Sequence, residues 1–173
     1  YAWRIAECKI YGASSGANLD WAQTLDRIVM EHVSIILVDT IREREAAFSI
    51  REAVFVDEQK VPSPLEFDGL DDDAEHLLAM LEARAAGTLR IRQIGETTGK
   101  IERVAVLKTA RGRSVGADLI RAALSRLRER GVREAKLHAQ THALDFYAKL
   151  GFDAYGAVFD EDGIPHRAMR IDL

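Results

Sequence analysis

A strand, a glycine-bearing turn and the start of a helix follow one another within residues 101–117, and this combination constrains the fold more than any other feature of the sequence. Apolar residues of 101–107 alternate with other residues, which is typical of a strand. Gly112 and Gly116 follow Arg111, and from Val115 onward apolar residues recur at the spacing of one helical face. Such a turn presents free backbone N–H groups to an anion, most often a phosphate. The sequence therefore predicts an anion-binding turn at this point.

The composition is that of an ordinary globular domain. A chain of 173 residues suits one domain, and its 47% hydrophobic and 30% charged residues are typical of soluble proteins. A net charge of −4 argues against a general nucleic-acid-binding protein, which neutralises phosphates with Lys and Arg. Cys8 is the only cysteine, so no intrachain disulfide forms. The sequence lacks a run long enough for a membrane span and the apolar core of a signal peptide, so we expect a cytoplasmic protein without membrane contact.

Residues 1–29 do not share the pattern of the rest. Gly12–Gly16 reads G-A-S-S-G, a composition typical of a flexible linker. The regular patterning of apolar residues begins just after Met30. We therefore expect an N-terminal extension over 1–29, of cloning origin or upstream of the natural start, and a single domain over 30–173.

Periodicity within that domain predicts strands and helices in the order β-α-β-β-β-α-β-α-β-β. The predicted elements are a strand over 32–38, a helix capped by Asp39 or Thr40 and ending near Phe55, strands over 76–81, 87–94 and 101–107, a helix ended by Gly131, a strand over 135–140, a helix over 141–150, and a hairpin of strands over 152–159 and 164–171. Pro62 and Pro64 predict a loop, because proline interrupts a helix. This order indicates a mixed α/β protein of the α+β type, with helices covering the faces of one sheet.

With these residues in place, the chain resembles the GNAT superfamily of N-acetyltransferases over residues 33–173. The phosphate-binding motif of that superfamily is Arg or Gln, two residues, Gly, one residue, then Gly or Ala. It falls here on Arg111, Ser114 and Gly116. Ser114 stands where Gly is usual, and its Cβ restricts how the loop turns.

Further segments are similar to a bacterial subgroup of that superfamily, the YjcF- and ElaA-like proteins. The shared segments read R-E-A-V-F-V-D-E-Q (51–59), E-x-D (66–68), A-E-H (74–76), G-T-L-R (87–90), K-I-E-R-V-A-V-L (100–107), L-H-A-Q-T (137–141), F-Y-A-K-L-G-F (146–152) and G-I-P-H (163–166). The resemblance implies a twisted, mostly antiparallel sheet of six to seven strands with helices on both faces. It also implies transfer of an acetyl group from acetyl-CoA, without a metal, to a primary amine of a small molecule or peptide that attacks the thioester directly.

The same resemblance assigns the residues that bind the cosubstrate. The backbone of Val104, Ala105 and Val106 would pair with the pantetheine arm and polarise the thioester carbonyl. The pyrophosphate would bind the N–H groups of the turn and helix start, formed by Arg111, Gly112, Arg113, Ser114, Val115, Gly116 and Ala117. Dimers are common in the superfamily, so a homodimer stays open, although no residue pattern marks an interface.

Acetyl transfer also requires proton transfers. Tyr147 stands where the superfamily has a tyrosine that protonates the leaving thiolate, and its alternative role is packing beside Phe146. The ammonium form of an amine must lose a proton before it attacks. Glu102, on the same strand as Val104, is the first candidate for that base, and His76 is the second. His138 and His166 rank below them, since each could equally be structural.

Three further questions stay open at the level of sequence. The acidic run from Glu66 to Glu75 is either a solvated loop or a surface that steers a cationic amine towards the site. The second question is whether the protein is instead a catalytically weak, acyl-CoA-binding domain that acts as a sensor or interaction module. The third is whether it is a nucleic-acid module. That possibility is disfavoured, because the arginines that such a module would use share a helix with acidic residues. Those arginines are Arg121, Arg126, Arg128, Arg130 and Arg133.

Overall fold

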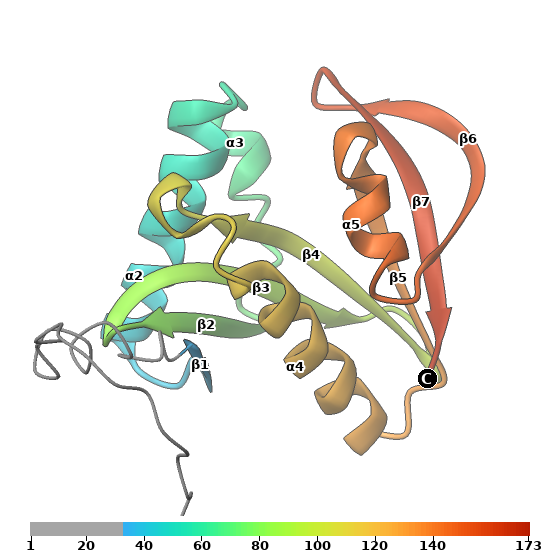
Figure 1. The fold of residues 1–173 in the computed structure, drawn as a ribbon, viewed down its shortest axis with the longest axis horizontal. Helices are drawn as coiled ribbons and strands as arrows, with labels where there is room; N and C mark the ends of the chain where they lie inside the picture. Colours follow the sequence, from blue (N-terminus) through green and yellow to red (C-terminus); the bar gives the residue numbers. More distant parts are fainter. Residues whose placement is uncertain (1–32) are drawn as a thin grey trace, which may run out of the picture. The chain divides into compact units, whose positions relative to one another are not determined.

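The structure, a computed structural model, describes residues 33–173. The extension expected over residues 1–29 and the domain start expected at Met30 lie outside the described residues. Within the described part, the order of strands and longer helices is the predicted one (Figure 1).

Seven strands form one sheet in the spatial order β1-β2-β3-β4-β5-β7-β6 (Figure 1). The strands are β1 (Val33–Leu37), β2 (Glu75–Leu81), β3 (Arg84–Gln93), β4 (Thr98–Val106), β5 (Glu134–Gln140), β6 (Asp153–Glu161) and β7 (Ile164–Asp172). All neighbouring strands are antiparallel except β4 and β5, which run parallel. This confirms the mostly antiparallel sheet of six to seven strands that the family resemblance implied.

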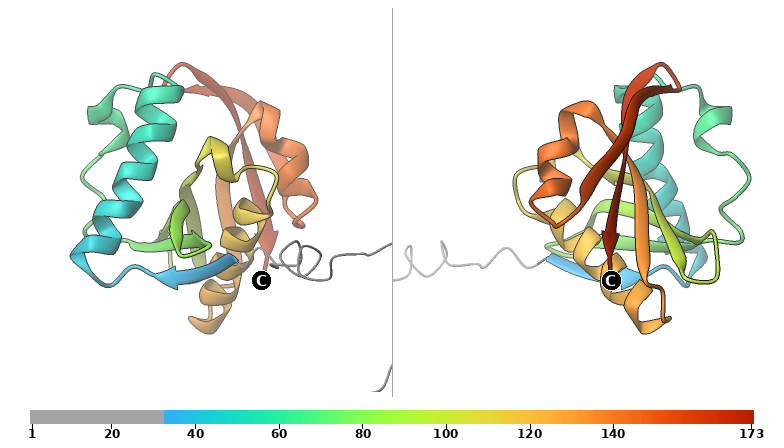
Figure 2. Two further views of the ribbon diagram at one scale, coloured as in Figure 1. Left: turned by 60° about the vertical axis from the view of Figure 1, so that its left-hand side comes forward. Right: turned by 90° about the vertical axis from the view of Figure 1, so that its right-hand side faces the viewer.

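Helices cover both faces of the sheet (Figure 2). The helical segments are α2 (Ile41–Arg51), the π-helix η2 (Glu52–Glu58), α3 (Ser63–Glu66), the 3-10 turn η3 (Lys108–Ala110), α4 (Val115–Glu129), the 3-10 turn η4 (Thr141–Ala143) and α5 (Leu144–Ala148). Each face of the sheet has its own cluster of buried hydrophobic residues. Leu77 packs with residues of α4 and α5, whereas its neighbour Leu78 packs with Ala47 and Ile50 of α2. Successive side chains of a strand point to opposite faces, so β2 contributes to both clusters.

Thr40 begins α2 with a capping box. Its Oγ1 accepts a hydrogen bond from Glu43 N at 3.2 Å, and Glu43 Oε2 accepts one from Thr40 N at 2.9 Å. This reciprocal pair satisfies two N–H groups that have no partner within the helix. The cap predicted at Asp39 or Thr40 is therefore at Thr40.

The end of this helix differs from the prediction. The helix was expected to end near Phe55, but it continues as the π-helix η2 to Glu58. Its wider turns include a hydrogen bond from Gln59 N to Val54 O. The segment with Pro62 and Pro64 was predicted as a loop and instead contains the single helical turn α3. Proline is tolerated there because the first N–H groups of a helix need no intrahelical acceptor.

The two central strands separate along their length. β4 and β5 pair only over Thr98–Lys100 and Glu134–Lys136. Beyond that point β4 carries a bulge opposite β3, between the pairs Arg90↔Glu102 and Thr88↔Ala105. Arg103 lies in this bulge with a left-handed φ of 53°. The extra residue bends the strand at this point.

Carboxylates of the acidic run turn inward, which corrects the prediction of a solvated or steering loop. Arg51 Nη1 contacts Asp71 Oδ1 at 2.6 Å, and Arg51 Nε contacts Glu66 Oε1 at 2.6 Å. Arg90 Nη1 lies 2.7 Å from Asp68 Oδ1. Both arginines are fully buried, and buried charges of this kind require such partners. We call Arg51, Arg90, Glu66, Asp68 and Asp71 the buried ion network.

The remainder of the run is also largely ion-paired. Glu75 binds Arg126 at 2.6 Å and also contacts Arg130, and Asp72 contacts Arg44. Arg126 and Arg130 therefore neutralise a carboxylate of their own chain.

Candidate active site

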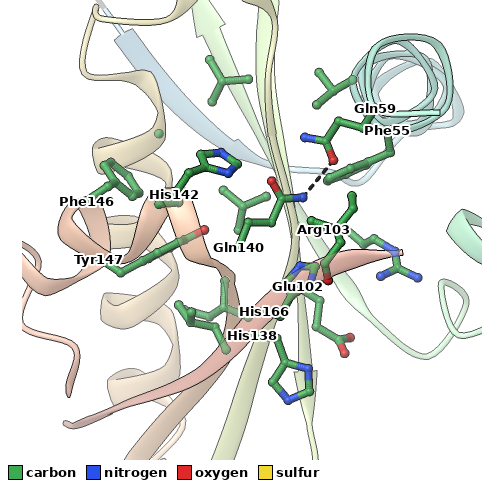
Figure 3. A pocket seen from close by; sticks show the side chains of 18 of the residues that line it. Phe55, Gln59, Glu102, Arg103, His138, Gln140, His142, Phe146, Tyr147 and His166 are labelled. Atoms are coloured by element: carbon green, nitrogen blue, oxygen red, sulfur yellow. Dashed lines mark hydrogen bonds between the residues drawn. The ribbon is translucent and has the colours of Figure 1, made fainter. Parts of the chain in front are cut away.

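A cavity of about 970 Å³ lies where β4 and β5 diverge (Figure 3). Residues from both sides of the sheet line it, since the gap between the strands connects the two faces. η2 contributes Phe55 and Glu58, α4 contributes Gly116, and α5 contributes Phe146 and Tyr147. The sheet adds Glu102, Arg103, Val104, Val106, His138, Gln140, Glu161 and His166. The cavity therefore brings the strand, the turn and the helix start of residues 101–117 together with residues distant in sequence.

The turn before α4 lies at one end of this cavity. Gly112 and Ser114 both have left-handed φ angles, 78° and 62°. The first intrahelical hydrogen bond of α4 runs from Asp118 N to Ser114 O at 3.0 Å, so the N–H groups of residues 115–117 precede it. The first N–H groups of a helix have no carbonyl partner within the helix and favour an anion. Ser114 thus adopts the left-handed conformation that Gly usually supplies. The Cβ of Ser114 makes this conformation energetically less favourable than it would be for Gly.

Arg111 and Arg113 of this turn bind carboxylates. The Arg111 guanidinium contacts Glu58 of η2 through two hydrogen bonds of 2.7 and 2.8 Å. Its Nε also donates to Val106 O at 3.1 Å. Arg113 Nη2 lies 2.8 Å from Glu82 Oε1. Arg111 therefore links β4 to η2 at the rim of the cavity.

The backbone of β4 faces the gap at Val104 and Val106. Leu107 N donates to Ala86 O, on the β3 side. Because successive N–H groups of a strand point to opposite edges, the N–H groups of Val104 and Val106 point towards the β5 side. Ala105 instead buries its side chain in the α2 cluster. An extended chain in the gap could pair with these two residues as an added strand would.

Tyr147 is 8% exposed, and its hydroxyl points into the cavity (Figure 3). Its ring packs edge-on against Phe146 at 4.9 Å and Phe152 at 6.0 Å. Burial raises the pKa of Tyr147, so the hydroxyl keeps its proton at neutral pH. Within residues 33–173 that hydroxyl has no hydrogen-bond partner, which leaves it available to a bound molecule.

Glu102 also lines the cavity, but three cations surround its carboxylate. Lys100 lies 2.9 Å away, Arg90 3.1 Å and Arg92 3.5 Å. Burial alone would raise the pKa of Glu102, yet the hydrogen bond from Lys100 and the two guanidiniums outweigh it and lower that pKa. A carboxylate held ionised in this way is a weak proton acceptor.

His76, on β2, is not among the residues that line the cavity. Its Nε2 is 3.3 Å from Asp71 O, and its ring packs edge-on against Phe48. Burial lowers the pKa of His76, and its Nδ1 is buried without a hydrogen-bond partner among the described residues. The structure brings Tyr147 and Glu102 to one cavity but does not bring His76 to it.

Two side-chain contacts in the cavity lining could not be predicted from the sequence. Gln140 Nε2 donates to Gln59 Oε1 at 2.9 Å and so bridges β5 and the end of η2 (Figure 3). At the other end, His138 Nδ1 lies 3.1 Å from Glu161 Oε2. Gln59, Gln140 and His138 belong to segments shared with the bacterial subgroup, but nothing in their spacing predicts these contacts.

No group of three or more His, Cys, Asp or Glu residues within 33–173 is arranged to hold a metal ion. The helices in that part of the chain are too short or too polar to cross a membrane.

Comparisons with known proteins agree with this geometry. A family model described as "Acetyltransferase (GNAT) domain" matches residues 38–173. YjcF of Bacillus subtilis, described as an uncharacterized N-acetyltransferase, is 37% identical over 127 residues, which are 73% of this chain and 90% of YjcF.

Solved structures share the fold over most of their length. The crystal structure of Escherichia coli ElaA is 29% identical with a TM-score of 0.72, covering 80% of this chain and 99% of that one. An acyl-CoA N-acyltransferase from Pseudomonas aeruginosa is 33% identical with a TM-score of 0.71, covering 80% of this chain and 99% of that one.

Proposed function

The chain belongs to the GNAT acetyltransferase family, and from this we propose that it moves an acetyl group from acetyl-CoA to a primary amine. The observation that carries the proposal is the cavity between β4 and β5, which extends from the start of α4 to the Tyr147 hydroxyl. An acyl-CoA has its charged pyrophosphate at one end and its reactive thioester at the other, and the cavity offers matching groups at both ends.

The pyrophosphate would bind the N–H groups of residues 112–117 and the N-terminal end of α4, since Arg111 N donates to Lys108 O at 3.5 Å. The helix dipole favours an anion there, and Arg111 and Arg113 add positive charge. Gly116, in the first turn of α4, also lines the cavity here. The pantetheine arm would extend along Val104, Ala105 and Val106, with the thioester carbonyl accepting a hydrogen bond from a β4 N–H group.

Tyr147 would act on the leaving group. As the C–S bond breaks, negative charge develops on sulfur, and a nearby hydroxyl donor stabilises that charge. The raised pKa of Tyr147 keeps the donor protonated, so it can give a hydrogen bond or its proton to the thiolate. The amine would attack the carbonyl carbon directly, without an acyl-enzyme, and no metal takes part.

Turnover of acetyl-CoA, measured as release of free thiol, tests this function. The acceptor panel should include polyamines, amino acids, aminoglycosides and peptides with free N-termini. We expect thiol release that depends on one class of amine and mass spectra with one added acetyl group on it. Stoichiometric CoA binding without thiol release across the panel would instead support a sensor or interaction module.

A further inference from the structure

His138 and Glu161 form a side-chain pair in the lining of the cavity. His138 Nδ1 is 3.1 Å from Oε2 of Glu161 and 3.3 Å from Oε1. Both residues line the cavity, and about a third of each side chain is exposed, 34% for His138 and 37% for Glu161. The pair is therefore accessible to a molecule that enters the cavity.

Sheet register explains how residues so far apart in sequence meet. In the antiparallel ladders, Gln140 of β5 lies opposite His166 of β7, and His166 lies opposite Phe159 of β6. Residues opposite each other share a face, and so do residues two apart on one strand. His138 and Glu161 therefore lie on the same face of the sheet as His166.

The β6–β7 turn fixes the position of Glu161. Glu161 pairs with Ile164, so only Asp162 and Gly163 form the loop. Both have left-handed φ angles, 57° and 80°, as a two-residue hairpin requires. Asp160 Oδ1 accepts a hydrogen bond from Gly163 N at 3.0 Å and braces the turn. The carboxylate is thus presented by a short, tightly constrained hairpin.

The carboxylate determines which nitrogen of His138 carries the proton. The hydrogen bond from His138 and the positive charge near it lower the pKa of Glu161, so this carboxylate is ionised and can only accept hydrogen bonds. The Nδ1 atom must then be the donor. In the neutral imidazole this leaves the lone pair on Nε2, which has no hydrogen-bond partner among residues 33–173.

Neighbouring groups hold the ring and set its electrostatic surroundings. The Phe159 ring packs edge-on against His138 at 4.9 Å and stacks on His166 at 6.2 Å. His166 Nδ1 donates to Ile164 O at 2.8 Å and lies 4.0 Å from Glu161. Lys100 acts on Glu161, and the charged side chains of Glu102, Arg103 and Asp162 also line the cavity.

This arrangement differs from that of Glu102. Three cations hold Glu102 ionised, whereas the Nε2 lone pair of His138 is left open to a proton when Nδ1 donates to Glu161. A carboxylate that orients a histidine through Nδ1 is also the arrangement that prepares an imidazole as a general base in other enzymes.

We propose that His138 is the general base for the incoming amine and that Glu161 is the residue that positions it. This proposal rests on the proposed acetyl transfer. The acceptor enters as an ammonium ion, and His138 Nε2 takes one proton from its nitrogen. The lone pair freed in this way forms the new N–C bond with the thioester carbonyl carbon. The C–S bond breaks with its electron pair on sulfur, which receives a proton from Tyr147. The second proton lost by the nitrogen returns to Tyr147 through solvent, and the imidazolium releases its proton to solvent, so one amide, one thiol and one released proton result.

Two measurements test the assignment, and the first needs no turnover. ¹⁵N NMR of the wild-type protein with bound CoA at pH 8, assigned through the His138→Gln variant, reports which ring nitrogen of His138 is protonated. We expect the proton on Nδ1, and a loss of that preference in Glu161→Gln. A proton on Nε2 of the wild type overturns the proposal.

The second measurement is the pH profile of kcat/KM with an amine that the wild type acetylates. We expect His138→Gln to lower kcat/KM about 100-fold and to remove the limb at acidic pH, while Glu161→Gln lowers it about ten-fold. CoA affinity and thermal stability of both variants should match the wild type. Glu129→Gln, an exposed carboxylate on α4, is the matched control and should leave the profile unchanged.

Other results of these measurements would overturn the assignment of His138 as the base. Wild-type turnover in His138→Gln, or loss of the acidic limb in His166→Gln but not in His138→Gln, overturns the assignment. A wild-type protein that binds CoA but acetylates no amine overturns the proposed function, and the assignment of the base falls with it.

Discussion

The guanidinium of Arg111 faces the carboxylate of Glu58 in a bidentate pair, with Nη1–Oε1 2.7 Å and Nη2–Oε2 2.8 Å. Glu58 is the last residue of η2, and Arg111 begins the turn that leads into α4. The ion pair therefore joins the π-helix to the proposed pyrophosphate site. It also places a negative charge next to groups that would bind an anion.

Removing that charge should strengthen cosubstrate binding. In Glu58→Gln, Arg111 is released from its carboxylate and one source of repulsion on the phosphates disappears. Because the pair is exposed, we expect a modest effect, about a three-fold lower Kd for CoA, which diminishes as salt is added. Isothermal titration calorimetry at two ionic strengths measures it. Glu52→Gln, at the exposed first position of η2, is the control and should leave the Kd unchanged.

Tyr147→Phe should separate catalysis from binding. The variant loses the hydroxyl that would stabilise the leaving thiolate, so we expect kcat to fall by about ten-fold or more. CoA affinity should remain near that of the wild type, and stability should not fall, because the hydroxyl has no partner within residues 33–173. Steady-state kinetics and calorimetry measure the two effects. Tyr155→Phe, on β6 and outside the cavity lining, should behave as wild type; unchanged turnover in Tyr147→Phe would remove this residue from the mechanism.

Ser114→Gly should stabilise the protein. The φ angle of 62° at Ser114 is unfavourable for a residue with a Cβ and is adopted freely by glycine. A gain of about 1 kcal/mol, partly offset by the greater freedom of glycine in the unfolded chain, corresponds to a rise in Tm of about 2 °C. Ser125→Gly within α4 should lower Tm instead, since glycine disfavours a helix interior. Equal effects of the two substitutions would contradict the strain at Ser114.

Breaking the buried ion network should destabilise the fold strongly. Asp71→Asn leaves Arg51 and Arg90 with one carboxylate fewer in a buried place, and we expect a loss of about 3 kcal/mol in the free energy of unfolding at pH 7. Urea denaturation measures it. Asp73→Asn changes an exposed residue of the same acidic run and should stay within about 0.5 kcal/mol of the wild type.

The same network predicts loss of stability in acid. The hydrogen bond from Arg90 lowers the pKa of Asp68, and at Asp71 the pull of Arg51 and Arg90 outweighs burial and lowers the pKa as well. A carboxyl whose pKa is lower in the folded state stabilises the fold at neutral pH, and that stabilisation is lost as pH falls below about 4. The free energy of unfolding should therefore fall between pH 4 and pH 2. That fall should be smaller in Asp71→Asn, and an identical fall would contradict the pairing.

Much of the fold could be predicted because its signals are local. The cap at Thr40, the amphipathic pattern of α4 and the Asp162–Gly163 turn each act within a few residues. The prediction was less accurate where local signals were weak. β3 was expected to begin at residue 87 but begins at Arg84, because the turn before it consists of Glu82 and Ala83, which are not typical turn residues.

The sequence alone therefore determined the order of the elements, the family resemblance and the glycine-bearing turn that precedes α4. Only the tertiary structure decided the rest of the site. Pairing in the sheet separates β4 from β5, turns Asp71 inward to Arg51, and brings Glu161 to His138 across two strands. These contacts depend on sheet register and on which face each side chain occupies. Neither the register nor the face can be predicted from the local pattern of residues, because both are fixed only when distant strands pair.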